Sequence, residues 1–175
     1  MRFLPLLFLF CASLPAQILN FGVKGGFPFN DAVKAAGNFH SEFQRWTAGP
    51  MVDLNLPFGL GIEANMLYRS TGYSNSTSHT AGSFEFPLLV KYKFPGKLAR
   101  MYVDSGFSFR HVGDIPQLMN SNSKGFVVGA GIRFDVKLFK ISPELRYTRW
   151  GNDIFAMPDL SSARNQTEFL IGITF

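Results

Sequence analysis

The sequence is poor in cysteine, histidine and charge. Its 175 residues include one cysteine, Cys11, and three histidines, and charged residues make up only 17% of the chain. A single cysteine forms no intramolecular disulfide, and histidines without a fixed spacing give no zinc signature. No glycine-rich segment opens a helix in the way that a phosphate-binding loop does. We therefore predict no catalytic residues, no cofactor and no metal ligands.

The sequence also lacks a sustained 3.6-residue apolar period, which would indicate helices, and a long apolar run. The apolar run Phe3–Ala12 is shorter than the roughly 20 residues that a membrane-spanning helix needs. It follows the basic Arg2 and precedes Pro15 and Ala16, an order typical of an export signal. We predict a cleaved signal peptide at residues 1–16 and one domain at residues 17–175. A lipid-modified Cys11 is a weaker alternative, since small residues do not precede it.

Aromatic residues and period-two alternation are abundant instead. Aromatics form 15% of the chain, and phenylalanine alone supplies 20 residues. Bulky apolar residues alternate with small or charged ones, and this alternation places one set on each face of a strand. It recurs eight times, which predicts strands at 19–29, 43–56, 60–73, 83–94, 101–111, 125–136, 141–150 and 166–175.

The connections between these strands alternate between long and short. The short ones, at 57–59, 95–100 and 137–140, contain turn formers such as Pro57 and Gly59. The long ones, at 30–42, 74–82, 112–124 and 151–165, are polar and irregular. Outer-membrane barrels sort their connections in this way, with short periplasmic turns and longer external loops. The pattern favours such a barrel over a soluble sheet.

The polar face of the strands is expected to line the interior. An eight-stranded barrel has a lumen that side chains can just fill, and the bulky face supplies too much volume for it. The polar face carries seven acids and seven bases, so that complete pairing is possible inside. These lumen charges are Lys24, Asp53, Glu63, Arg69, Glu85, Lys91, Lys93, Asp104, Arg110, Arg133, Asp135, Glu144, Arg146 and Glu168.

Aromatic residues gather near the two ends of the predicted strands. We expect them to form two girdles at the polar boundaries of a bilayer. Phe58, Phe94, Phe139 and Phe175 fall at the end with short turns, and Phe29, Trp46, Tyr68, Tyr73, Tyr147 and Trp150 fall toward the other.

Four segments resemble the small bacterial outer-membrane beta-barrel family (outer membrane protein beta-barrel domain, OmpX-like). They are Gly22–Gly26, Phe86–Phe94, Pro143–Tyr147 and the terminal Phe169, Ile171, Ile173 and Phe175. The resemblance implies an all-β fold, an eight-stranded antiparallel up-and-down transmembrane β-barrel in the cell outer membrane. It also implies that the terminal alternating residues are read by the barrel-assembly machinery.

The expected function is an integral outer-membrane protein with a structural, adhesive or surface-interaction role, a lumen plugged by charged side chains, and no catalysis. Its expected partners are outer-membrane lipid, the assembly machinery and external ligands of the long loops. Nucleic acid is not expected, because the net charge of +5 comes without a basic stripe.

Two alternatives remain open from sequence alone. One is an exported soluble barrel that binds a small apolar ligand, which requires the apolar face inward. The other is an outer-membrane enzyme that modifies lipid A, with His111, Ser108 or Ser105, and Asp114 at one rim.

Overall fold

The computed structural model describes residues 18–29, 33–35, 46–75, 77–96, 98–112, 122–151, 160–162 and 164–175. Nearly all of them lie in strands, with one short 3₁₀ turn. The elements are β1 (Leu19–Pro28), β2 (Val33–Ala35), β3 (Trp46–Asn55), η1 (Pro57–Gly59), β4 (Leu60–Asn65), β5 (Leu67–Asn75), β6 (Thr77–Lys93), β7 (Ala99–Val112), β8 (Asn122–Asp135), β9 (Lys140–Trp150), β10 (Leu160–Ser162) and β11 (Asn165–Thr174). In the described part of the chain, no helix is long and apolar enough to cross a membrane.

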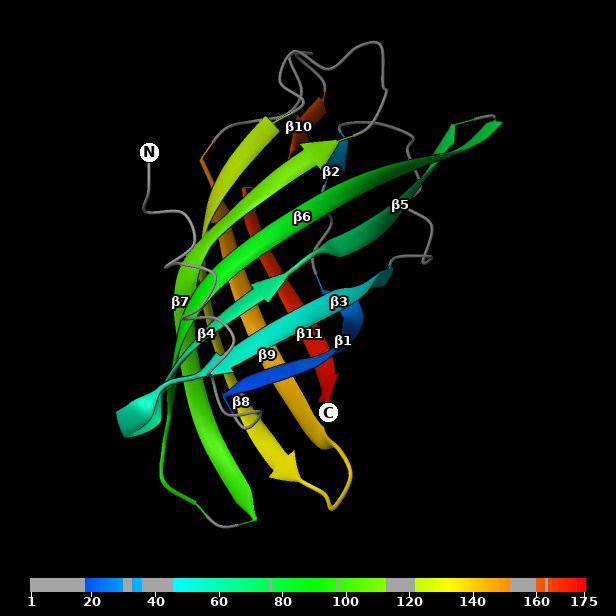
Figure 1. Cartoon of the computed structure of the whole chain (residues 1–175). Helices are drawn as coiled ribbons and strands as arrows, with labels where there is room; N and C mark the ends of the chain where they lie inside the picture. The colour runs from blue at the N-terminus through cyan, green and yellow to red at the C-terminus, as the bar shows by residue number, and fades with distance from the viewer. Residues whose placement is uncertain are drawn as a thin grey trace, which may run out of the picture.

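The strands close into an antiparallel barrel (Figure 1). Each barrel strand pairs with its neighbours along the chain, and β1 pairs with both β3 and β11 to close the sheet. β4 and β5 both pair with β3 and β6 and together serve as one strand. The predicted eight-stranded fold is therefore confirmed. Closure removes every sheet edge from the barrel wall.

The interruption between β4 and β5 at Met66 has a local cause. The Met66 amide donates to the Pro50 carbonyl at 3.1 Å, but proline has no N–H to return the second bond of the pair. The register is the same on both sides, since Met51 pairs with Asn65 and Ala48 pairs with Tyr68. The ladder loses one bond there without a shift in which side chains face inward.

Glycine permits close contact where the barrel closes. A Cβ atom on Gly22 would lie 2.0 Å from the Ile173 carbonyl oxygen, and one on Gly26 would lie 1.9 Å from the Phe169 oxygen. Both glycines belong to β1 and face β11, and no other residue fits so close to a neighbouring backbone.

One end of the barrel has tight connections. Phe58 and Gly59 in η1 adopt positive φ values of 64° and 80°. The β8–β9 turn is closed by a bond from the Val136 amide to the Phe139 carbonyl at 2.9 Å. The Phe175 amide donates to the Phe21 carbonyl, which places the C-terminus at this short-turn end.

The opposite, long-loop end differs from the sequence expectation in two places. The predicted loop at 74–82 is mostly strand, because β5 and β6 continue pairing up to Asn75 and Thr77. Their polar residues do not prevent this, since the ladder is formed by backbone groups. The paired arm extends beyond the other strands in Figure 1. Two further predicted loops contain the unexpected small sheet of β2 and β10.

Apolar side chains cover the outside of the barrel. Leu88, Val90 and Phe107 are 55%, 59% and 61% exposed, although each lies in the middle of a strand. A soluble barrel with an apolar ligand would need these side chains inside, so that alternative is wrong. The apolar residues with inward parity, Leu67, Leu89, Val127 and Leu170, are fully buried.

One predicted girdle residue is misplaced. Trp150 is buried inside the barrel, where its indole N–H donates to Gln166 Oε1 at 3.1 Å. The physical reason is parity, since Trp150 shares the inward side of β9 with Arg146 and Thr148. Phe58, Phe94, Phe175, Phe29, Trp46 and Tyr147 are exposed, and Tyr68 and Phe139 are half-buried. The Tyr73 side chain lies outside the described part of the chain.

Candidate functional site

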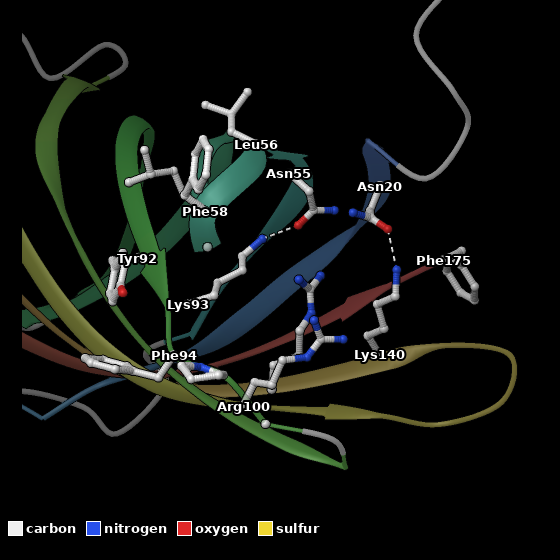
Figure 2. Close-up of a pocket in the computed structure, with 15 residues that line it drawn as sticks. Asn20, Asn55, Leu56, Phe58, Tyr92, Lys93, Phe94, Arg100, Lys140 and Phe175 are labelled. Atoms are coloured by element: carbon white, nitrogen blue, oxygen red, sulfur yellow. Dashed lines mark hydrogen bonds between the residues drawn. The ribbon is translucent and has the colours of Figure 1, made fainter.

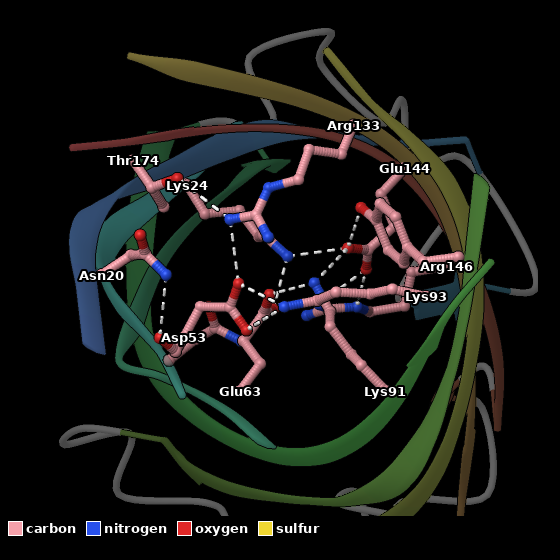
Figure 3. A network of polar contacts seen from close by, with 12 residues as sticks. Asn20, Lys24, Asp53, Glu63, Lys91, Lys93, Arg133, Glu144, Arg146 and Thr174 are labelled. Atoms are coloured by element: carbon pink, nitrogen blue, oxygen red, sulfur yellow. Dashed lines mark hydrogen bonds and ion pairs between the residues drawn. The ribbon is translucent and has the colours of Figure 1, made fainter. Parts of the chain in front are cut away.

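The polar side chains meet in the lumen (Figure 3). Of the fourteen predicted lumen charges, the structure places twelve at 6% exposure or less. The other two, Lys93 and Asp135, are half-buried near the short-turn end. Water cannot solvate the buried ones, and all of them except Asp104 are paired with opposite charges in the protein. They divide into three clusters along the barrel.

The central cluster joins residues from β1, β4, β6 and β9. Lys24 Nζ lies 2.5 Å from Glu63 Oε1 and 2.7 Å from Glu144 Oε2. Arg146 Nη2 lies 3.2 Å from Glu63 and 2.6 Å from Glu144, and Lys91 pairs with Glu63 as well. Two carboxylates thus hold three cations, and the bridges connect opposite walls of the barrel.

The outer cluster lies toward the long-loop end and contains two bases and two acids. Arg69 Nε lies 2.8 Å from Glu85 Oε1, and Arg69 also pairs with Glu168. Arg110 Nη2 lies 2.7 Å from the same Glu85 oxygen. The Arg110 guanidinium carbon lies 3.8 Å from the centroid of the Trp150 ring, within the range of a cation–π contact. This cluster is balanced in charge.

The inner cluster lies at the short-turn end. Asp53 Oδ2 accepts from Lys93 at 2.9 Å and from Arg133 at 3.0 Å. Arg100 pairs with Asp135, and Lys140 donates to the Asn20 side-chain oxygen. A cavity of about 860 Å³ opens beside these residues (Figure 2).

Asp104 is different from the other lumen acids. It is buried in the middle of β7, but neither of its carboxylate oxygens has a hydrogen-bond partner among the described residues. Its Oδ1 atom lies 2.4 Å from where a Cβ on Gly129 would stand, so that the glycine makes room for it. The structure brings Asp104 near the central cluster without pairing it.

Several polar residues that line the lumen were not predicted from the sequence. The Tyr102 hydroxyl donates to Glu144 Oε2 at 2.9 Å, and Gln166 Oε1 accepts from both Arg110 and Trp150. Parity would have found Tyr102 and Gln166, which share the inward faces of Asp104 and Glu168. Arg100 and Lys140 also have inward parity, but the predicted strands began one residue after each of them.

The rim residues considered for catalysis do not converge. His111 is exposed on the outer face of β7, whereas Ser108 is buried on the inner face of the same strand. Asp114 lies outside the described residues, as does His40. Within the described ranges, no group of three or more histidine, cysteine, aspartate or glutamate side chains could hold a metal ion.

The four predicted assembly residues lie on one face of the last strand. Ile171 and Phe175 are exposed, and Phe169 and Ile173 are half-buried. All four point away from the lumen, whose wall is formed here by Glu168, Leu170 and Thr174.

Comparison with known proteins agrees with this architecture. The model of the outer membrane protein beta-barrel domain family matches residues 3–173. Neisserial surface protein A (NspA) has a similar fold, with a TM-score of 0.61 at 12% identity, over 91% of this chain and 96% of that one.

Two other solved barrels were also found. The N-terminal barrel of Pseudomonas aeruginosa OprF has 16% identity over 90% of this chain and 96% of that one, with a TM-score of 0.49. Ail of Yersinia pestis has 13% identity over 90% and 97% of the two chains, also with a TM-score of 0.49. Comparison with curated protein sequences gives no match.

The contrast between Glu63 and Asp104 gives a testable prediction. Glu63→Gln should lower the free energy of unfolding by about 3–5 kcal/mol, because it leaves Lys24, Lys91 and Arg146 with too little compensating charge. Asp104→Asn should change it by less than about 1 kcal/mol, because it removes a longer-range charge interaction but no hydrogen bond and no direct ion pair. Urea unfolding in detergent micelles measures both. Equal losses for the two variants would contradict the pairing described here.

Proposed function

The chain belongs to the outer membrane protein beta-barrel domain family, and we propose that it is a structural or adhesive barrel with a closed lumen. The protein resides in the cell outer membrane, with its apolar outer surface in lipid. The ion-paired lumen is the observation on which the proposed function rests.

Closure of the lumen is supported by the width and connectivity of the charge network. Eight strands leave an interior that side chains can fill, whereas water-filled porins use about 16–18 strands. Lys24 on β1 bridges Glu63 on β4 and Glu144 on β9, so the central cluster crosses the interior. Long paired side chains at this level support a lumen without a continuous aqueous path.

A surface-interaction role is supported by the asymmetry of the two ends. At the long-loop end, the arm formed by β5 and β6 extends past the rest of the barrel (Figure 1). In this family of barrels the longer connections face outside the cell. The arm and the adjoining connections therefore offer the surface that external ligands would contact.

A non-catalytic role is supported by the chemistry of the lumen and the rim. The Glu63 and Glu144 carboxylates are used in ion pairs, and His111 and Ser108 lie on opposite faces of β7.

Biogenesis completes the proposal. Residues 1–16 would direct export and be removed, and the barrel-assembly machinery would read Phe169, Ile171, Ile173 and Phe175. The outward, alternating placement of these four side chains supports that role, because it gives the end of the chain one continuous apolar face.

The closed lumen predicts an absence of ion conduction. Purified protein in a planar bilayer should give no stable conductance steps, because the paired side chains fill the interior. A sixteen-stranded porin reconstituted in the same lipid provides the positive control. Large, stable and ion-selective steps from the monomer would contradict the proposal.

The terminal aromatic provides a second prediction. Deletion of Phe175 should reduce the folded barrel in the outer-membrane fraction several-fold, because the signal loses its last residue. Phe94→Ala removes another exposed aromatic at the same rim and serves as the control. If the two variants assemble equally well, Phe175 is only a girdle residue.

A further inference from the structure

We propose that the cavity at the short-turn end binds a multiply charged anion that carries phosphate. This cavity, here called the inner vestibule, has a volume of about 860 Å³ and opens at the mouth of the barrel (Figure 2). A volume of this size lies within the roughly 300–1,000 Å³ that small-molecule sites occupy. The proposal is independent of whether the lumen conducts.

The side chains that line the inner vestibule carry charge of one sign. Its lining contains four basic residues, Lys93, Arg100, Arg133 and Lys140, and no acidic one among the described residues. Two acids, Asp53 and Asp135, lie behind the wall and pair with three of these bases. Four bases against two acids leave a surplus of two positive side-chain charges.

Among the lumen side chains that the structure describes, the surplus is confined to this end of the barrel. The outer cluster has two bases, Arg69 and Arg110, for the two acids Glu85 and Glu168. The central cluster has three bases, Lys24, Lys91 and Arg146, paired with Glu63 and Glu144, and the unpaired Asp104 near Glu144 adds a third negative charge at this level. A buried network formed only for stability would be balanced here as well, whereas an excess of cations around a cavity draws an anion.

Hydrogen-bond donors are available in the inner vestibule. Lys140 donates to a neutral amide oxygen on Asn20, and none of the described carboxylates lies within ion-pair distance of it. Arg133 uses Nη2 for Asp53, while its buried Nε has no partner among the described residues. Arg100 is partly exposed, with 40% of its side chain open to solvent. Guanidinium groups match the geometry of phosphate oxygens and hold them through two parallel bonds.

The position of the inner vestibule suggests two sources for the phosphate. Short turns of such barrels face the periplasm, so a soluble periplasmic anion could enter. The exposed Phe58 and Phe175 line the same cavity and would lie at the bilayer boundary, next to lipid headgroups. Both sources would present phosphate oxygens to the basic side chains of the inner vestibule.

Calorimetric titration with inorganic pyrophosphate tests the site. Full-length folded protein in a zwitterionic detergent should show saturable binding with one ion per barrel, weakened by salt. The double variant Arg100→Gln/Lys140→Gln should lower the affinity by at least about tenfold, because two charged donors are lost. Lys124→Gln removes an exposed lysine from the opposite end of β8 and should leave the affinity unchanged.

A second measurement distinguishes the two sources of phosphate, and a check of folding excludes misfolded variants. Each variant is first checked for the far-ultraviolet spectrum of the folded barrel. The titration is then repeated in phosphatidylcholine nanodiscs with and without phosphatidylglycerol. Weaker pyrophosphate binding with the anionic lipid supports a headgroup in the inner vestibule, and unchanged binding supports a soluble anion. Absence of saturable binding, or equal loss in Lys124→Gln and the double variant, would overturn the proposal.

Discussion

Ion pairing inside a narrow closed barrel is the interaction on which the rest of this structure depends. Charges withdrawn from water are costly, and their mutual attraction offsets that cost only when geometry and hydrogen bonding are good. Glu63 meets this condition with three cations and the Asn65 amide. Because these contacts join strands that are distant in the sequence, they oppose collapse of the barrel and its opening alike.

The apolar outer surface is a consequence of the charged interior. A protein with charge at its centre and bulky apolar groups outside is stable only where the outside meets hydrocarbon. The wall must also allow close approach at its seam, which Gly22 and Gly26 permit. The two functions proposed for the interior, closure of the lumen and binding of an anion, belong to regions that differ in their balance of charge. We propose that the paired centre closes the passage and that the cationic surplus at the inner vestibule leaves one end able to hold a ligand.

The architecture could be predicted from sequence because period-two alternation survives in nearly every strand. The same parity assigned the lumen charges, and extending it would have found Tyr102, Gln166 and Trp150. Partner choice could not be predicted, since it depends on strand stagger around the barrel. Glu63 and Glu144 share cations although they lie on β4 and β9. The β5–β6 arm was missed because backbone pairing there is not marked by apolar side chains.

A double-mutant cycle on Lys24 and Glu63 tests the central claim most directly. Both side chains are fully buried and 2.5 Å apart, so the account predicts a coupling energy above about 1.5 kcal/mol. Arg100 and Asp135, which are partly exposed at the mouth, provide the reference pair and should couple by less than about 1 kcal/mol. Unfolding in lipid vesicles by urea measures both cycles. Coupling as weak for Lys24 and Glu63 as for the exposed pair would mean that water fills the lumen, and would contradict the account.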